Sequence, residues 1–218
     1  MHWRILPHAT ACVASDKLFL LDLRQDRYFR VPVASQAEFA EWLDRRYACA
    51  PPPSVLEVLL RGGILREGDE TPTNALKQRG DVPEPCASCP DWNRQDLQQA
   101  RVGATVAAAW ARLRLFSLHR LIVKRSECSP PRDCRPVAEI LAAAEQFERS
   151  RNWTPIARNC LLDSLALDSW LARRGIVATL VFGIAAEPFQ AHCWLQTRDA
   201  LINDSYDHVS RFTPIFSA

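Results

Sequence analysis

The residues best suited to chemistry in this 218-residue chain are a cysteine, a histidine and an aspartate in its last third. Cys160 opens an apolar stretch, His192 follows 32 positions later, and Asp204 another 12 positions later. A cysteine hydrolase needs a thiolate nucleophile, an imidazole that shuttles its proton and a carboxylate that fixes the imidazole's tautomer. The three side chains therefore predict nucleophilic acyl chemistry, provided that the fold brings them together.

The sequence around Cys160 favours a reactive thiol. Asn159 is a favoured helix N-cap, so Cys160 is expected in the first turn of a helix that continues to Arg174 and ends at Gly175. Unpaired amides and the positive end of the helix dipole stabilise an anion at that position. The pKa of the thiol should therefore fall toward the working pH.

Three apolar segments after this helix are predicted to be strands: residues 176–184, 191–195 and 200–203. The second segment carries His192, and the third ends just before Asp204. A cysteine on a helix packed against such a sheet is the layout of papain-like and transglutaminase-like sites. Strand alternation sends Asn203 and Asp204 to opposite faces, so the pattern alone leaves open which of them orients the histidine.

Residues 1–66 are predicted to form a small winged helix-turn-helix-like domain. Aromatic and branched segments flank a polar turn at residues 24–27, which favours a hairpin. The segment Ser35–Glu38 has the spacing of a capping box and predicts the start of a helix. A second short helix is expected over Val55–Leu60, stopped by Gly62 and Gly63, before a last strand at residues 64–66.

The remainder of the chain is predicted to be a linker and a second domain. Residues 67–93 are rich in proline and charge and have little apolar periodicity, which indicates a linker. Residues 94–218 begin with a helical pattern that should break at residues 129–133, and Pro136 suits the first position of the next helix. The fold class predicted is α+β, with a papain- or transglutaminase-like cysteine peptidase domain after the small N-terminal domain.

Composition excludes several classes of protein. The net charge of +2 is too balanced for a nucleic-acid binder. Apolar runs fall short of the roughly 18 residues of a membrane span, and the N-terminus lacks the features of a signal peptide. We therefore expect a cytoplasmic protein with reduced thiols and no membrane or nucleic-acid partner.

Two further groups of residues have alternative interpretations. A CxxC and two later cysteines could form a four-thiolate zinc site, but the loose spacing of the second pair favours no metal (Cys86, Cys89, Cys128 and Cys134). Five basic residues are most simply a solvated helix face, with a docking surface for a partner enzyme as the alternative (Arg112, Arg114, Arg120, Lys124 and Arg125).

The region from Asn159 to Ser205 closely resembles the B proteins that mature lasso peptides, including the microcin type. Four motifs carry the resemblance: Cys160–Leu167 with its Cys-Leu and Ser-Leu-Ala-Leu, Leu180–Ile184, Glu187–Trp194, and Ile202–Ser205. The resemblance implies a transglutaminase-like cysteine peptidase that removes the leader from a lasso precursor peptide. By the same resemblance Cys160 is the nucleophile, His192 the general base and then acid, and Asp204 the residue that orients His192.

The resemblance also gives the N-terminal domain a role in recognition. It implies that the leader is captured as an added strand, a mode that suits an exposed strand edge beside a helix. Six residues are expected to line this groove, with membership of the small domain's core as the alternative for each: Tyr28, Phe29, Arg30, Val31, Val55 and Leu59.

The implied partner is a cyclase resembling asparagine synthetase, which closes the lasso ring with ATP; this chain is expected to need no cofactor. The Cys160 amide is expected to stabilise the oxyanion with a second donor, for which Trp153 and Asn159 are the nearest candidates in sequence. Two alternatives remain open: acyl transfer to an amine by the same thiol, and a non-catalytic chaperone that presents the precursor.

Overall fold

The computed structural model describes residues 2–44, 51, 53–68, 96–127 and 135–218. Its N-terminal elements are β1 (His2–Ile5), β2 (Ala9–Ala14), β3 (Lys17–Asp22), β4 (Arg27–Arg30), α1 (Val33–Asp44), α2 (Pro53–Arg61) and β5 (Leu65–Gly68). The C-terminal elements are α3 (Asp96–Leu115), α4 (Leu118–Glu127), α5 (Val137–Arg151), α6 (Cys160–Ala172), β6 (Thr179–Ala186), β7 (Phe189–Gln196), α7 (Tyr206–Val209) and β8 (Thr213–Ser217).

The N-terminal part is built on an antiparallel sheet of order β2-β3-β4, so the predicted hairpin is confirmed. The turn from β3 to β4 includes Asp26 in the left-handed region (φ 51°), which aspartate tolerates better than most residues. In the same turn the Asp22 carboxylate accepts a hydrogen bond from the Arg24 amide at 2.8 Å. This turn reverses the chain into β4, which is an edge strand of the sheet.

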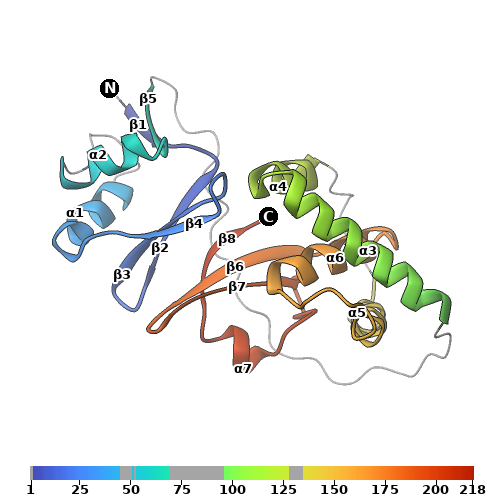
Figure 1. Ribbon diagram of the computed structural model, residues 1–218. Helices are drawn as coiled ribbons and strands as arrows, with labels where there is room; N and C mark the ends of the chain where they lie inside the picture. Colours follow the sequence, from blue (N-terminus) through green and yellow to red (C-terminus); the bar gives the residue numbers. More distant parts are fainter. Residues whose placement is uncertain (1, 45–50, 52, 69–95, 128–134) are drawn as a thin grey trace.

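Strand β3 is buried on both faces. Leu18 and Leu20 pack with α1 and α2 in a small core, whereas Phe19 and Leu21 belong to the main core of the C-terminal part. Alternating side chains therefore point into two different cores, as the twofold period of a strand requires. The N-terminal sheet is a layer shared by both halves of the molecule (Figure 1).

Several N-terminal details differ from the sequence prediction. Helix α1 begins at Val33, so Ser35 lies inside its first turn and the predicted capping box does not start it. The strand predicted at residues 64–66 is β5, and its partner is β1, a strand of four residues that was not predicted. A winged helix-turn-helix stays a prediction. Of the predicted linker, residues 69–93 lie outside the described residues.

The C-terminal part is a mixed helix-and-sheet layer structure. Its antiparallel sheet has the order β7-β6-β8. Helix α6 packs against β7, with α3 and α5 against α6, while α7 lies on the other side of the sheet (Figure 1). The predicted buried stripe of α5 is confirmed at Ile140, Ala144 and Phe147.

Other predictions for this part need correction. The helical pattern from Arg94 breaks at residues 116–117, earlier than expected, which separates α3 from α4. Pro136 is the N-cap of α5 and not its first residue. The segment 200–203 is not a strand but makes a single bridge between Leu201 and Gln196. The third strand of the sheet is β8, which includes Pro214 and was missed because proline disfavours a strand interior.

The two halves meet at the tip of the β6–β7 hairpin. The Phe189 ring lies 5.7 Å from the ring centroids of both Phe19 and Tyr28, and Lys17 pairs with Glu187. Strands β2 and β8 also approach each other, where the Thr10 hydroxyl donates to the Ile215 carbonyl at 2.9 Å. Among the helices described, none combines the length and the apolar character needed to cross a membrane.

Candidate active site

Cys160 is the first residue of α6, as the sequence predicts. The Asn159 side chain accepts hydrogen bonds from the amides of Leu161 at 3.0 Å and Leu162 at 3.3 Å. This cap satisfies two orphan donors of the helix and leaves the amide of Cys160 outside its reach. The helix ends at Ala172, and Gly175 follows with a positive φ of 73°.

The loop that leads into Cys160 is held by a buried arginine. The Arg151 side chain is 1% exposed, and its Nε donates to Asp163 at 2.7 Å, in the first turn of α6. Its Nη2 donates to the carbonyls of Ile156 at 2.9 Å and Ala157 at 3.3 Å. One guanidinium thus joins the end of α5, the loop and the helix that carries the cysteine.

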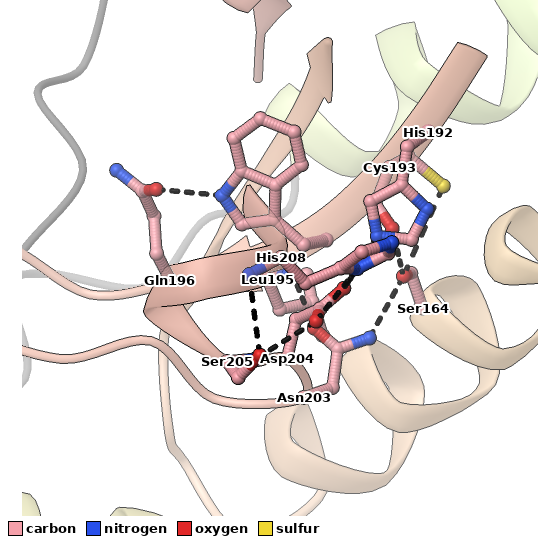
Figure 2. Close-up of polar contacts among 10 residues, drawn as sticks. Ser164, His192, Cys193, Leu195, Gln196, Asn203, Asp204, Ser205 and His208 are labelled. Atoms are coloured by element: carbon pink, nitrogen blue, oxygen red, sulfur yellow. Dashed lines mark hydrogen bonds and ion pairs between the residues drawn. The ribbon is translucent and has the colours of Figure 1, made fainter. Parts of the chain in front are cut away.

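His192 and Asp204 form the second part of the site (Figure 2). Nε2 of His192 lies 2.5 Å from Oδ2 of Asp204, although 12 residues separate them in sequence. The other ring nitrogen, Nδ1, is left for the hydrogen bond between the imidazole and the Cys160 thiol. The structure therefore brings Cys160, His192 and Asp204 together in the order thiol, imidazole, carboxylate.

Aromatic packing restricts the orientation of the imidazole. The His192 ring centroid lies 6.0 Å from that of Trp194, 4.7 Å from that of His208 and 5.1 Å from that of Phe212. Gly183, opposite His192 in the register, has no side chain because a Cβ there would lie 2.7 Å from the Trp194 ring. The His192 side chain is 15% exposed and is held on several sides.

Asn203 has a different role from Asp204. Its Oδ1 accepts from the Leu195 amide at 2.7 Å, and its Nδ2 donates to the Ser164 hydroxyl at 3.0 Å. The Ser164 hydroxyl in turn donates to the carbonyl of Cys193 at 3.3 Å (Figure 2). Asn203 therefore ties its loop to β7 and α6, and Asp204 is the residue that contacts the histidine.

The electrostatics favour a thiolate–imidazolium pair. Hydrogen bonds from Cys193 and, against the opposing effect of burial, from His192 lower the pKa of Cys160 to about 4. Burial lowers the pKa of His192, but the hydrogen bonds to Asp204 and Cys160 outweigh it and raise that pKa to about 9. At neutral pH the thiol is consequently ionised and the imidazole protonated.

This pair predicts a bell-shaped pH profile for any reaction of the thiol that needs both charges. Activity should fall as pH decreases through about 4, because the thiolate of Cys160 is protonated. It should also fall as pH increases through about 9, because His192 loses the proton it must donate. The two limbs belong to the coupled pair. The profile of kcat/KM, together with the rate of Cys160 alkylation against pH, measures both limbs.

Asp204→Asn is the matched variant for this profile. Without the carboxylate, the alkaline limb should move to lower pH, since the hydrogen bond to Asp204 is the largest effect that raises the pKa of His192. An alkaline limb that stays in place in Asp204→Asn would contradict the assignment of that limb to His192.

The six residues predicted to bind a leader fall into two groups. Tyr28 and Phe29 are half-buried and Arg30 is exposed, all on the edge strand β4. Tyr28 packs against the main core and Phe29 against the small core, so they face opposite sides of the sheet. The other three are buried in the small core, at 0 to 2% exposure: Val31, Val55 and Leu59. Their role in leader binding stays a prediction.

The sequence analysis did not single out three residues of the site. Cys193 and Ser164 lie beside Cys160, and the Nδ1 of His208 lies 3.0 Å from both carboxylate oxygens of Asp204. A signal existed for His208, which is four positions after Asp204. For Cys193 and Ser164 there was none, because their contact depends on how α6 lies on β7.

Metal ligation was considered from the sequence at four cysteines, Cys86, Cys89, Cys128 and Cys134, and all four lie outside the described residues. Within the part of the chain that the structure describes, the group able to hold a metal ion is His192, Asp204 and His208, whose ligand atoms lie within 4.8 Å of one another. Hydrogen bonds to the shared carboxylate already account for this arrangement.

The region from α3 to β8 matches a known protein family. Residues 102–217, just over half of the chain, match the transglutaminase-like superfamily. The chain belongs to this superfamily. Comparison with curated proteins and with solved structures gave no match. The transglutaminase-like superfamily supplies a fold used by cysteine peptidases and acyltransferases, and the matched region contains all three residues of the predicted catalytic set.

Proposed function

We propose that this transglutaminase-like protein is a cysteine peptidase that removes the leader from a lasso precursor peptide. The observation that carries the proposal is the contact of Cys160 with His192, whose far nitrogen is held by Asp204. The four motifs that resemble lasso B proteins, between Asn159 and Ser205, supply the substrate class. Cys160, His192 and Asp204 take the roles of nucleophile, general base and acid, and orienting carboxylate.

The proposed reaction begins with the ion pair already formed. The Cys160 thiolate attacks the carbonyl of the last leader residue, and the Cys160 amide, which the Asn159 cap does not occupy, stabilises the oxyanion. The His192 imidazolium donates its proton to the departing amine of the core peptide, which leaves a thioester on Cys160. A water molecule, deprotonated by His192, then attacks the thioester and releases the leader as a carboxylic acid.

The experiment that tests this proposal is incubation of the full-length protein with a lasso precursor peptide in water enriched in oxygen-18. Hydrolysis gives a shortened peptide and a leader with the heavy isotope in its new carboxylate. Acyl transfer would give a leader joined to an added amine without the isotope. An unchanged precursor, in the presence of the partner cyclase as well as in its absence, would support the chaperone alternative and overturn the proposal.

The same proposal assigns leader recognition to the edge of β4. The sheet order β2-β3-β4 leaves one side of this strand unpaired by the described strands. An added leader strand would gain main-chain hydrogen bonds there and contact Tyr28, Phe29 or Arg30 through alternate side chains. The turn before β4 also lies near the thiol, since burial and then the Cys160 charge raise the pKa of Asp26.

Leader peptides methylated on single backbone nitrogens test this mode of binding without any change to the protein. Methylation at positions that donate to β4 should weaken binding by about fivefold each, since each removes a hydrogen bond worth about 1 kcal/mol. The intervening positions point away and serve as controls. Fluorescence polarisation of labelled peptides measures both sets, and an equal effect at every position would contradict strand addition.

A cavity between α3, α4 and α6 is the proposed docking place for an acidic segment of the partner cyclase. The cavity has a volume of about 480 Å³ and an apolar floor that includes Phe116, Leu121 and Leu165. Arg112, Arg120 and Lys124 lie at its margin and supply charge complementary to an acidic segment. Arg125, also predicted for this surface, is instead bound to Asp168 through two hydrogen bonds of 2.8 Å.

Charge reversal tests the docking proposal. Arg120→Glu combined with Lys124→Glu should weaken association with the cyclase by about tenfold or more, and chiefly by slowing association at low salt. Arg114→Glu is the matched control, because Arg114 is exposed on α3 over the Trp110 ring and is not part of the cavity. An equal loss in both proteins would indicate a general charge effect and no specific site.

A further inference from the structure

Cys193 lies beside the start of α6: its sulfur is 3.9 Å from the hydroxyl of Ser164, one helical turn after Cys160. The two thiols also shift each other's pKa, and the proposed reaction makes no use of the chemistry of Cys193. We propose that Cys193 is a resolving thiol, which closes a disulfide with Cys160 after a peroxide has oxidised the nucleophile. The disulfide would mask Cys160 reversibly and protect it from permanent oxidation. The regulatory role of this disulfide rests on the proposed function. Formation of the disulfide can be measured whether or not the protein is a peptidase.

The geometry around Ser164 supports the contact between the two cysteines. Cys160 and Ser164 are four residues apart on α6 and therefore share one face of the helix. Ser164 meets Cys193 twice: its hydroxyl lies 3.9 Å from the Cys193 sulfur and donates to the Cys193 carbonyl at 3.3 Å. Figure 2 shows Ser164 of α6 facing Cys193 of β7, and Cys160 lies on the same face of that helix one turn earlier.

The two thiols differ in solvent exposure and in protonation, as a nucleophile and its resolving thiol should. Cys160 is partly exposed, so a small oxidant can reach it, whereas Cys193 is 2% exposed and is protected from direct attack. Cys160 is ionised at neutral pH, whereas the interaction of Cys193 with Cys160 as a hydrogen-bond partner, and then burial, hold the pKa of Cys193 well above its usual range. The nucleophile is therefore oxidised first, and the second thiol keeps its proton until it reacts.

The chemistry balances with hydrogen peroxide as the oxidant. The Cys160 thiolate attacks one peroxide oxygen, the O–O bond breaks, and hydroxide leaves, so that Cys160 becomes a sulfenic acid. The Cys193 sulfur then attacks the Cys160 sulfur as the S–O bond breaks. The thiol proton and the departing hydroxide leave as water. One peroxide is reduced to two waters, counting the proton that hydroxide takes from solvent, and two thiols are oxidised to one disulfide.

A buried cysteine can also be a small apolar side chain with no reactivity, and Cys12 provides that comparison. Cys12 is partly buried on β2 opposite Phe19 and packs against the same core. Cys12→Ser therefore removes a thiol from the same core and keeps Cys193, the proposed partner of Cys160.

The experiment treats the full-length protein with a small excess of hydrogen peroxide and blocks the remaining thiols with an alkylating reagent. Peptide mapping by mass spectrometry should show the Cys160 and Cys193 peptides joined, with the loss of both thiol hydrogens, and Cys12→Ser should give the same product. Dithiothreitol should restore alkylation of both cysteines. In Cys193→Ser, Cys160 should instead progress to sulfinic acid, which dithiothreitol does not reverse.

Two results would overturn the inference: Cys160 reaching sulfinic acid as fast in the unmodified protein as in Cys193→Ser, or a disulfide of Cys160 with a cysteine other than Cys193. Mapping of the unmodified protein decides the question even if Cys193→Ser does not fold. Peptidase activity is a separate readout. A Cys160–Cys193 disulfide in a protein that never cleaves precursor would refute the proposed function alone, and cleavage without the disulfide would refute this inference alone.

Discussion

Cys160→Ala should reduce precursor cleavage by at least about 10⁴-fold, while the affinity for the leader stays unchanged. Alanine removes the sulfur that forms the thioester and keeps the helix start, because the cap comes from Asn159. The leader is proposed to bind at β4, in a different element from the nucleophile. Single-turnover cleavage with excess protein measures the first quantity, and fluorescence polarisation of a labelled leader measures the second.

Cys12→Ser is the control for loss of a thiol elsewhere, and it should retain both cleavage and binding. Binding that disappears together with cleavage in Cys160→Ala would contradict the separation of recognition from chemistry. Cleavage that survives in Cys160→Ala would remove this cysteine from the nucleophile's role.

Arg151→Met should lower the free energy of unfolding by about 3–5 kcal/mol, the cost of leaving one partner of a buried ion pair without the other. Methionine preserves much of the apolar stem and removes the guanidinium. The lost contacts are those to Asp163 and to the carbonyls of Ile156 and Ala157, in the loop before Cys160. Urea unfolding measures the change as a lower midpoint at an unchanged slope.

Arg149→Met is the matched control on the same helix. Arg149 pairs with Glu145 at 2.6 Å, but its side chain is 53% exposed, so the same substitution should cost no more than about 1 kcal/mol. Adding Asp163→Leu to Arg151→Met should recover part of the loss, because the uncompensated carboxylate is then removed as well. Equal costs for Arg149→Met and Arg151→Met would show that burial of the Arg151 pair contributes nothing.

The parts of the site that follow local rules could be predicted from the sequence. The Asn159 cap places Cys160 at the helix start by contacts within three residues, and the sequence contains all the information that this cap needs. The β2–β3–β4 meander likewise follows from alternation and a polar turn. Alternation left the choice between Asn203 and Asp204 open, and it does not apply in the structure because the segment 200–203 is not a strand.

Features that depend on packing between distant segments could not be predicted. Strand β8 pairs with β6, some 30 residues earlier, and its sequence Thr-Pro-Ile-Phe-Ser gives no clear strand signal. Burial of β3 on both faces depends on the C-terminal core, which the hairpin pattern alone does not reveal. Cys193 looked like an ordinary strand residue, because its neighbour Cys160 is 33 positions away in sequence.

The aromatic contacts of Phe189 fix the distance between the edge strand β4 and the active site. Tyr28 on β4 and Phe19 on β3 pack against Phe189 at the start of β7, three residues before His192, so the edge strand β4 and the strand of the histidine belong to one packed body. On the proposed function, the number of leader residues between the anchored strand and the scissile bond is then constant. One inserted residue moves an extended chain by about 3.3 Å, as far as the whole approach distance of a reacting pair. The protein would thus find its cleavage point by counting residues from the anchor, with little need to recognise the residue that it cuts.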